Sequence, residues 1–180
     1  MALTSANVRV GVTGSVYKAP TGTAAPTDTG TALNVAFVEL GYVSGAGLTE
    51  TRSVASQDIK AWQNAEVVRT VVTEGKVTYQ FTLIETTEAV LEAYYGTAAT
   101  LGVSEGSITV RPTTTGGRAS WVFNVVDGAE LLRIYIAEGE ITEWGDIVYA
   151  SGEPIGYQVT VTAYPVSGVA ATKFSTALTS

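Results

Sequence analysis

Cysteine and histidine are both absent from this chain of 180 residues. Without cysteine there is no disulfide frame, no thiolate nucleophile and no thiolate metal site. Without histidine the chain lacks the commonest general base and metal ligand, and every Ser-His or Cys-His arrangement. The glycine-rich segments at 11–14 and 41–47 precede neither a Lys-Ser/Thr pair nor a helix that would hold phosphate. These absences disfavour catalysis by a serine or cysteine nucleophile, a thiolate or histidine metal site, and a nucleotide cofactor.

Charged residues are scarce, at 15% of the chain, against roughly 25% in a typical soluble domain. Threonine, glycine and alanine largely replace them, so a β-rich chain of this kind has little protection against edge-to-edge pairing of strands. Two explanations stay open: the surface is buried in an assembly, or the chain is a threonine-rich extracellular sandwich. The net charge of −7 disfavours nucleic acid or anionic lipid as a main ligand.

Long apolar runs are missing as well. No stretch approaches the ~20 residues that span a bilayer. Residues 1–7 have neither the basic start nor the apolar centre of a signal peptide. We expect no membrane association, and synthesis in a cytoplasm.

The segment Val67–Gly96 carries the clearest patterns. Apolar residues alternate with polar ones from Val77 to Leu83, as in a strand with one buried face. Glu74-Gly75 before it predicts a tight turn, so that Val67–Leu83 would be a hairpin. From Glu88 the apolar spacing becomes three and four, which predicts a short helix. Thr86 or Thr87 would cap its start, and Gly96 would end it in the left-handed conformation.

The remaining strands are expected at 8–16, 33–43, 107–111, 120–126, 131–137, 140–150 (broken at Trp144-Gly145-Asp146) and 155–166. In the last of these, Tyr157, Val159, Val161 and Ala163 would face in, and Gln158, Thr160 and Thr162 out. Residues 44–65 read as a projecting arm, and the tail from about 167 as loose. Many short strands joined by turn residues predict a single domain over 1–180, an antiparallel β-sandwich or barrel with one short flanking α-helix.

Two groups of side chains invite a functional interpretation. Seven carboxylates fall within 27 residues, and calcium or glycosidase chemistry competes there with a solvated acidic edge. They are Asp127, Glu130, Glu138, Glu140, Glu143, Asp146 and Glu153. The three tryptophans could serve as carbohydrate platforms, but Trp121 lies in an alternating run that predicts the core. Trp62 lies in the arm, where an interface competes with burial.

Four stretches resemble one known family in their order and spacing. They are VGVTGSVYKAPTGTAAPTD, AFVELGYVSGAGLTE, DIKAWQNAEVVRTV and FTLIETTEAVLEAYYG, which together run through most of 8–96. The second half matches only in its strands and in the closing YQVTVTAYP. On these residues the chain resembles the major tail tube proteins of long-tailed (siphovirus-type) bacteriophages, particularly those that infect actinobacteria.

That resemblance implies a structural virion protein made in the host bacterium, whose hexameric rings stack into the tail tube. It also implies that the chain is not an enzyme, with no catalytic residue, no metal ligand and no cofactor. DNA would pass through the tube without specific binding, and tape-measure, terminator or tip proteins would be partners. The arm would reach between rings, with Leu48, Arg52, Asp58, Ile59 and Trp62 as its contact residues. A negative lumen or edge would use the acidic residues Asp127, Glu130, Glu138, Glu140, Glu143 and Asp146.

Two other classes of function stay open from the residues alone. A secreted or surface β-sandwich that binds glycan would need an exposed aromatic groove. A hydrolase would need two of the carboxylates in one cleft. The sequence leaves open the host, the presence of a contractile sheath and the oligomeric state before assembly.

Overall fold

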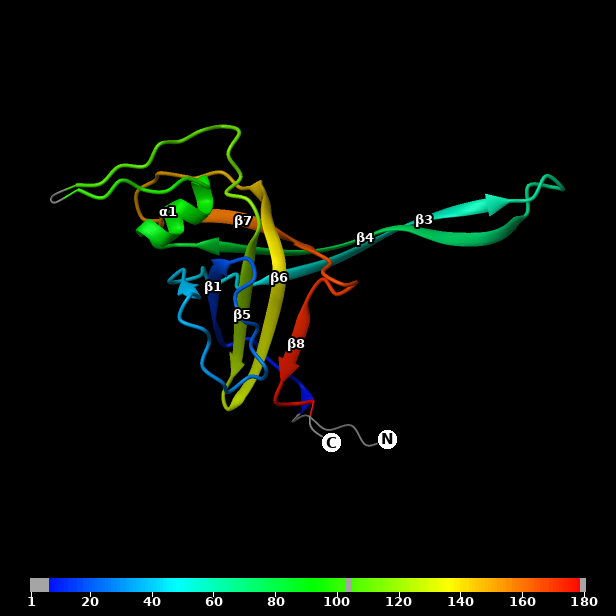
Figure 1. Cartoon of the computed structure of the whole chain (residues 1–180), viewed down its shortest axis with the longest axis horizontal. Coiled ribbons are helices and arrows are strands. Elements are labelled where there is room, and N and C mark those ends of the chain that lie inside the picture. The colour runs from blue at the N-terminus through cyan, green and yellow to red at the C-terminus, as the bar shows by residue number, and fades with distance from the viewer. Residues whose placement is uncertain (1–6, 103–104, 179–180) are drawn as a thin grey trace.

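The computed structural model describes residues 7–102 and 105–178 (Figure 1). These residues form one helix, α1 (Glu88–Tyr95), and eight strands. The strands are β1 (Thr13–Pro20), β2 (Val38–Glu39), β3 (Thr49–Lys60), β4 (Val67–Leu83), β5 (Ala119–Asp127), β6 (Glu130–Trp144), β7 (Tyr157–Tyr164) and β8 (Thr172–Ser175). The predicted fold class, mainly β with antiparallel strands and one short helix, is confirmed.

All strands belong to one antiparallel sheet with the order β2-β1-β5-β6-β7-β4-β3. β8 pairs with β6 at residues 132–135, next to the stretch 138–144 that pairs with β7. The segment 40–44 approaches both ends of the sheet: Leu40 N–H donates to the Val16 carbonyl (2.9 Å), and Ser44 N–H donates to the Thr82 carbonyl (2.8 Å). The sheet therefore curls on itself without closing.

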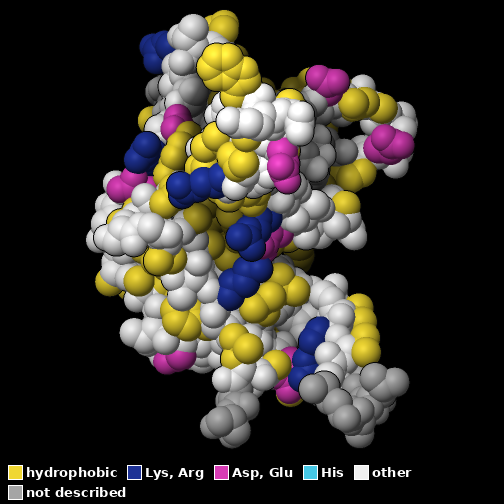
Figure 2. Space-filling view, turned by 90° about the vertical axis from the view of Figure 1, so that its right-hand side faces the viewer, with side chains coloured by type: hydrophobic (Ala, Val, Ile, Leu, Met, Phe, Trp, Pro, Cys, Tyr) yellow, Lys and Arg dark blue, Asp and Glu magenta, His cyan; other side chains and the backbone are white. Residues whose placement is uncertain are grey.

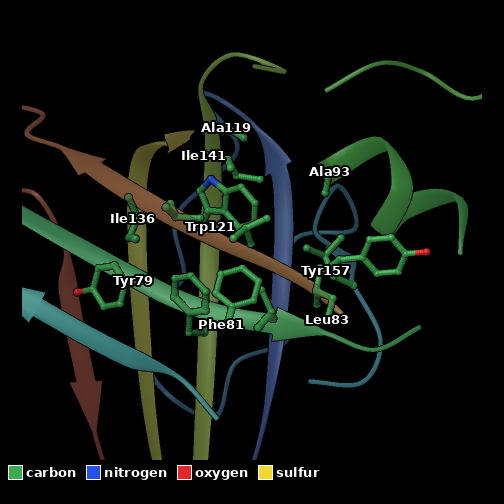
Figure 3. Close-up of a cluster of buried hydrophobic side chains, with 14 of the residues drawn as sticks. Tyr79, Phe81, Leu83, Ala93, Ala119, Trp121, Ile136, Ile141 and Tyr157 are labelled. Carbon is green, nitrogen blue, oxygen red and sulfur yellow. The ribbon is translucent and has the colours of Figure 1, made fainter. Parts of the chain in front are cut away.

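The concave face of this sheet holds an aromatic core (Figure 3). The ring of Phe81 on β4 meets Phe123 and Trp121 on β5, with centroids 5.5 Å and 6.3 Å apart. Tyr79 stacks on Phe123 at 5.3 Å. Trp121 is 1% exposed, which confirms its predicted place in the core. The helix α1 adds Val90 and Ala93 to the same cluster.

The loop between β1 and β2 covers the opposite face of β1, β5 and β6. Phe37 packs there on Val122, with Leu33 and Tyr135 around them. Arg133 on β6 is 6% exposed and holds this loop, because its guanidinium donates to the carbonyls of Asp28 (2.9 Å) and Thr31 (2.8 Å). Both faces of this part of the sheet are thus packed.

The predicted helix caps are confirmed. The Thr87 side chain accepts from Val90 N–H (3.4 Å), and Gly96 follows the last helical residue at φ 65°. A Cβ on Gly96 would lie 2.3 Å from Gly116 N, so the loop 97–118 returns directly over the end of the helix. The glycine is required both by the backbone angle and by this close approach.

The predicted turn at Glu74-Gly75 is wrong. β4 runs unbroken from Val67 to Leu83, and Gly75 pairs with Val54 inside the β3–β4 ladder. The actual turn lies at 61–66, where Asn64 and Ala65 have φ of 57° and 54°. A glycine inside a strand is tolerated, and asparagine adopts the left-handed region more readily than most residues. The local glycine signal was therefore misleading.

Other strand predictions differ in extent. The span 33–43 contains the short β2 and a single bridge from Val43 to Leu83, and 107–111 contributes a single bridge between Thr100 and Ser107. β6 continues through the expected boundary between 137 and 140, and ends at Trp144 without a further strand before β7. The tail expected to be loose contains β8, which pairs with β6.

The predicted alternation of β7 is correct for its inner residues, which are all buried. Thr160 and Thr162 lie in the alternate positions but are only 6% and 5% exposed. Their neighbours on β4 and β6 flank them, and Thr142 shares a hydrogen bond with Thr162 (2.7 Å). The middle strand of a sheet is covered by the side chains on either side even where no layer packs on top.

Candidate assembly surfaces

The most prominent surface is a two-stranded arm formed by residues 52–76, which projects from the body of the molecule (Figure 1). β7 accompanies β4 only from Val77 onward, so the arm has no third strand. The part of β4 outside the body, Val67–Lys76, spans roughly 30 Å at ~3.3 Å per residue. An isolated two-stranded hairpin is marginally stable in water. An arm of this length is therefore a candidate for a surface that packs against another molecule.

The arm exposes apolar side chains along its whole length. All 12 residues of β3 are exposed. Trp62 at the tip is 98% exposed, and valines or isoleucine are 48–65% exposed on both strands. These aliphatic residues are Val54, Ile59, Val67, Val68 and Val72. Such a continuous apolar display marks an interaction surface on a folded protein.

The structure brings four of the five predicted arm residues together. Arg52 lies at the base of the arm and pairs with Val77, and Ile59 lies opposite Arg69 near the tip. Asp58 accepts a hydrogen bond from the Thr70 hydroxyl (2.7 Å) across the two strands. Leu48 is different, since it precedes β3 and packs against the main core.

Sequence reasoning missed half of this surface. Residues 67–76 were placed in a hairpin within the body, although they form the second strand of the arm. The available signal was Asn64, because asparagine between two polar-apolar alternating runs favours a turn. Its neighbour Ala65 gives no such signal, although its φ is also positive.

The base of the arm is tied to the C-terminal strand. Lys173 on β8 forms an ion pair with Glu50 on β3 (2.6 Å). Glu50 pairs across the ladder with Tyr79, whose hydroxyl is buried and has no hydrogen-bond partner among the described residues. Burial, and then the nearby Glu50 carboxylate, raise the pKa of Tyr79 well above its ordinary value. This contact holds β8 and β3 together although they do not pair.

The predicted acidic residues do not form one patch. Asp127 and Glu130 flank the β5–β6 turn, whereas Glu143 and Asp146 lie at and beyond the other end of β6. Thirteen residue steps separate Glu130 from Glu143, or roughly 40 Å along a strand at ~3.3 Å per residue. The acids at the two ends of β6 therefore cannot share one cleft, whereas Asp127 and Glu130 are partners across the β5–β6 ladder.

Four of the acids have partners in their own chain. Asp127 accepts from Val10 N–H (3.0 Å), and Glu130 pairs with Arg9 (3.4 Å). Glu138 pairs with Arg118 (2.5 Å), and Glu140 accepts from the Thr115 hydroxyl (2.7 Å). The described residues contain no group of three or more acids placed to hold a metal ion. Their local role is to fix turns and loops along β6.

Comparison with known proteins gives the family. The chain matches the model of the family described as "Phage tail tube protein" over residues 1–176. It belongs to that family. As a member it is a structural protein of the bacteriophage tail, and the resemblance drawn from the sequence is confirmed at this level. Among curated proteins, none matches the chain.

A comparison with solved structures also finds similarity to this tail tube family member. The similar structure is a chain of the "Cryo-EM structure of the anti-feeding prophage (AFP) baseplate, 6-fold symmetrised". The TM-score is 0.42 at 13% sequence identity, over 89% of this chain and 92% of that chain. Within the described residues, no helix of the tail tube protein is long and apolar enough to cross a membrane.

Proposed function

We propose that this chain forms hexameric rings that stack into the tail tube of a long-tailed phage of the kind that infects actinobacteria. The tube is the conduit through which DNA leaves the virion. During assembly a tape-measure protein occupies it, and terminator and tip proteins close its ends. The family membership supports the tube, and the resemblance of the first 96 residues supports the finer assignment.

The exposed arm is the observation that carries this proposal. A tube needs two kinds of heterologous contact, one that closes a ring and one that stays open and repeats along the axis. The arm supplies an apolar and charged surface that the subunit itself leaves uncovered. In the proposed tube the arm reaches from one ring to the next, with Arg52, Asp58, Ile59 and Trp62 as contact residues.

We assign the lumen to the outward face of β4, β7 and the last part of β6. That face carries mainly hydroxyl and amide side chains and three carboxylates, with Lys76 and Arg118 at its margin. Its residues are Thr78, Gln80, Thr82, Gln158, Thr160, Thr162, Glu138, Glu140, Thr142 and Glu143. Phosphate binds chiefly to lysine and arginine, so a face dominated by hydroxyls, amides and carboxylates lets DNA slide. Of the predicted lumen acids, Glu138, Glu140 and Glu143 belong to this face. A map of the tube with this face outward would contradict the assignment.

The experiment is electron microscopy of the purified protein at high concentration, with an arm-deleted variant beside it. Ser53 and Lys76 are partners in the ladder, so residues 54–75 can be replaced by Asn-Gly, which favours a two-residue hairpin turn. We expect tubes or stacked rings from the full chain, and folded particles without tubes from the variant. Strictly monomeric particles of the full chain at every concentration would refute the proposed function.

A further inference from the structure

A small aromatic pocket lies at the end of the molecule away from the arm. Its lining is Tyr94, Tyr95, Arg111, Pro112, Thr114 and Trp144, and its volume is about 210 Å³. The rings of Tyr94 and Tyr95 meet edge to face, 5.1 Å apart. Trp144 is 39% exposed although its ring N–H is bonded. Flat rings beside a guanidinium are a favourable environment for another aromatic ring.

The walls of this pocket are held rigidly. Trp144 Nε1–H donates to the Tyr94 carbonyl and the Tyr94 hydroxyl donates to the Gly145 carbonyl, each at 2.7 Å. Tyr94 also packs edge to face on Tyr157, with centroids 5.5 Å apart. A ligand that enters therefore does not have to order the walls, and rigid aromatic pockets of this kind are typical binding hot spots.

Trp62 is the side chain of this protein that best fits such a pocket. It is 98% exposed at the tip of the arm, and the turn that presents it is closed by a hydrogen bond from Ala61 N–H to the Glu66 carbonyl (2.8 Å). The ordered turn already fixes its backbone, so burial costs mainly the freedom of two side-chain torsions. Tryptophan is also among the residues most enriched at interface hot spots.

The same copy cannot fill its own pocket. The arm extends from the body on the side opposite α1, whose last turn supplies Tyr94 and Tyr95 (Figure 1). Trp62 and the pocket therefore lie at opposite ends of one molecule. Two such different patches on one chain make a head-to-tail contact that repeats from copy to copy.

Charge favours the same pairing. The arm, residues 52–76, carries four basic residues (Arg52, Lys60, Arg69, Lys76) and three acidic ones (Asp58, Glu66, Glu74), a net of +1. The rest of the chain then carries 6 basic and 14 acidic residues, a net of −8 (10−4 and 17−3). None of the arm's four basic residues forms an ion pair among the described residues.

Basic residues of the arm and an acidic residue near the pocket lie close to the proposed contact. Viewed along the arm, lysine and arginine side chains gather in the middle of the face (Figure 2). At the pocket, the exposed Asp146 follows Trp144 by two residues, whereas Glu143 pairs with Thr160 on the opposite face of β6. Lys60 and Arg69, close behind Trp62 on the arm, have the opposite sign. Opposite charges around an apolar centre fix the orientation of a contact.

We propose that Trp62 of one copy inserts into the pocket of Tyr94, Tyr95, Arg111 and Trp144 on a second copy. Lys60 and Arg69 then lie near Asp146 of that copy. This inference rests on the proposed function, because it names the receptor of the assembly arm. The occupant of the pocket is a second copy of this chain.

Cysteine cross-linking tests the contact directly, because the natural chain has no cysteine. We mix two singly substituted variants under assembly conditions and oxidise them. Gln63→Cys lies beside Trp62, and Thr113→Cys lies beside the pocket. We expect a disulfide-linked dimer that contains one chain of each kind. Val35→Cys replaces Thr113→Cys as the control, since Val35 is 99% exposed but lies outside the pocket. Tubes without the 63–113 link, or equal linking to position 35, would overturn the proposal.

The concentration needed for assembly gives an independent measure. We expect Trp62→Ala to raise it at least tenfold and Trp62→Phe to raise it less, because phenylalanine keeps a ring for the pocket. Val35→Ala is the control for loss of an exposed apolar side chain, and circular dichroism verifies that each variant is folded. Assembly of Trp62→Ala at the wild-type concentration would overturn this contact and leave the tube intact. A wild-type chain that never assembles would instead refute the proposed function.

Discussion

Trp144 and Tyr94 hold each other through two hydrogen bonds that join the end of β6 to the end of α1. The indole N–H of Trp144 donates to the Tyr94 carbonyl, which lies in the last turn of the helix, where carbonyls lack helical partners. The Tyr94 hydroxyl returns a bond to the carbonyl of Gly145. These two hydrogen bonds hold Trp144 and Tyr94 in contact although they are 50 positions apart in the sequence. The two side chains form one wall of the pocket.

Replacing Trp144 by phenylalanine tests the hydrogen bond from the indole N–H to the Tyr94 carbonyl. The ring remains but the N–H is lost, so we expect the free energy of unfolding to fall by about 1 kcal/mol. Urea denaturation measures the change. Trp62→Phe is the matched control, and because that side chain is 98% exposed we expect less than about 0.5 kcal/mol. Equal effects at the two positions would show that the Trp144 bond contributes nothing.

Gly96 is expected to tolerate no side chain. Gly96→Val combines a positive φ with a clash against the backbone at 115–116, so we expect a loss of more than about 2 kcal/mol in the free energy of unfolding. Gly47→Val separates the two effects: its φ is +69°, yet a Cβ there meets nothing within 4 Å. That control isolates backbone strain, at roughly 1–2 kcal/mol. A smaller loss at Gly96 than at Gly47 would contradict the close packing of the loop on the helix.

We expect ionisation of Tyr79 to lower the stability of the fold at alkaline pH. Its pKa is raised in the folded state by burial and by Glu50, so the folded chain keeps the phenolic proton when the unfolded chain has lost it. The contribution of protonated Tyr79 to the free energy of unfolding is complete below the unfolded pKa of about 10, and it is lost as pH rises above that value. Tyr79→Phe removes this dependence. It also removes a buried hydroxyl without a partner, so we expect a gain of about 1 kcal/mol at pH 7.

The measurement is the difference in unfolding free energy between Tyr79→Phe and wild type from pH 7 to 11. Lys18 titrates in the same range with the opposite sign, because burial lowers its pKa and the nearby Glu92 only partly offsets this. Its contribution therefore increases stability as pH rises. Lys18 is present in both proteins and cancels in the difference. A difference that does not grow above pH 10 would contradict the assignment to Tyr79.

Arg133 is expected to fasten the loop that covers the outer face of the sheet. Arg133→Lys keeps the charge but loses the planar fork that reaches Asp28, Thr31 and Asn124, so we expect a loss of about 2 kcal/mol. Arg118→Lys is the control, because the Arg118–Glu138 pair is half-exposed and worth at most about 1 kcal/mol. Thermal unfolding of both variants checks this. Equal losses would mean that burial of Arg133 adds nothing.

The sequence predicts best where one local pattern decides the structure. The helix at 88–95 has helical spacing, a threonine cap and a terminal glycine, and all three are present in the structure. Likewise Trp121 and the inner residues of β7 are buried as their alternation requires. These features depend on side chains within a few residues of each other.

The arm was harder to predict because two interpretations satisfy the same residues. Residues 67–74 are rich in valine and threonine, and residues 77–83 alternate, so a hairpin at Gly75 and one long strand both fit the sequence. The choice depends on β3, a separate strand that extends the ladder past Gly75. Likewise the acids of β6 are close in sequence, but an extended strand separates them in space.

The two irregularities in the β3–β4 ladder have a consequence for the free subunit. They fall between Ala55 and Ser56 and between Ile59 and Lys60. An exposed strand can recruit identical strands into fibres when it offers roughly six flat residues in register. The outer stretch of β3, Ser56–Ile59, is shorter than that and twisted at both ends. The outer half of the arm thus offers other copies no flat stretch of the length that fibres need.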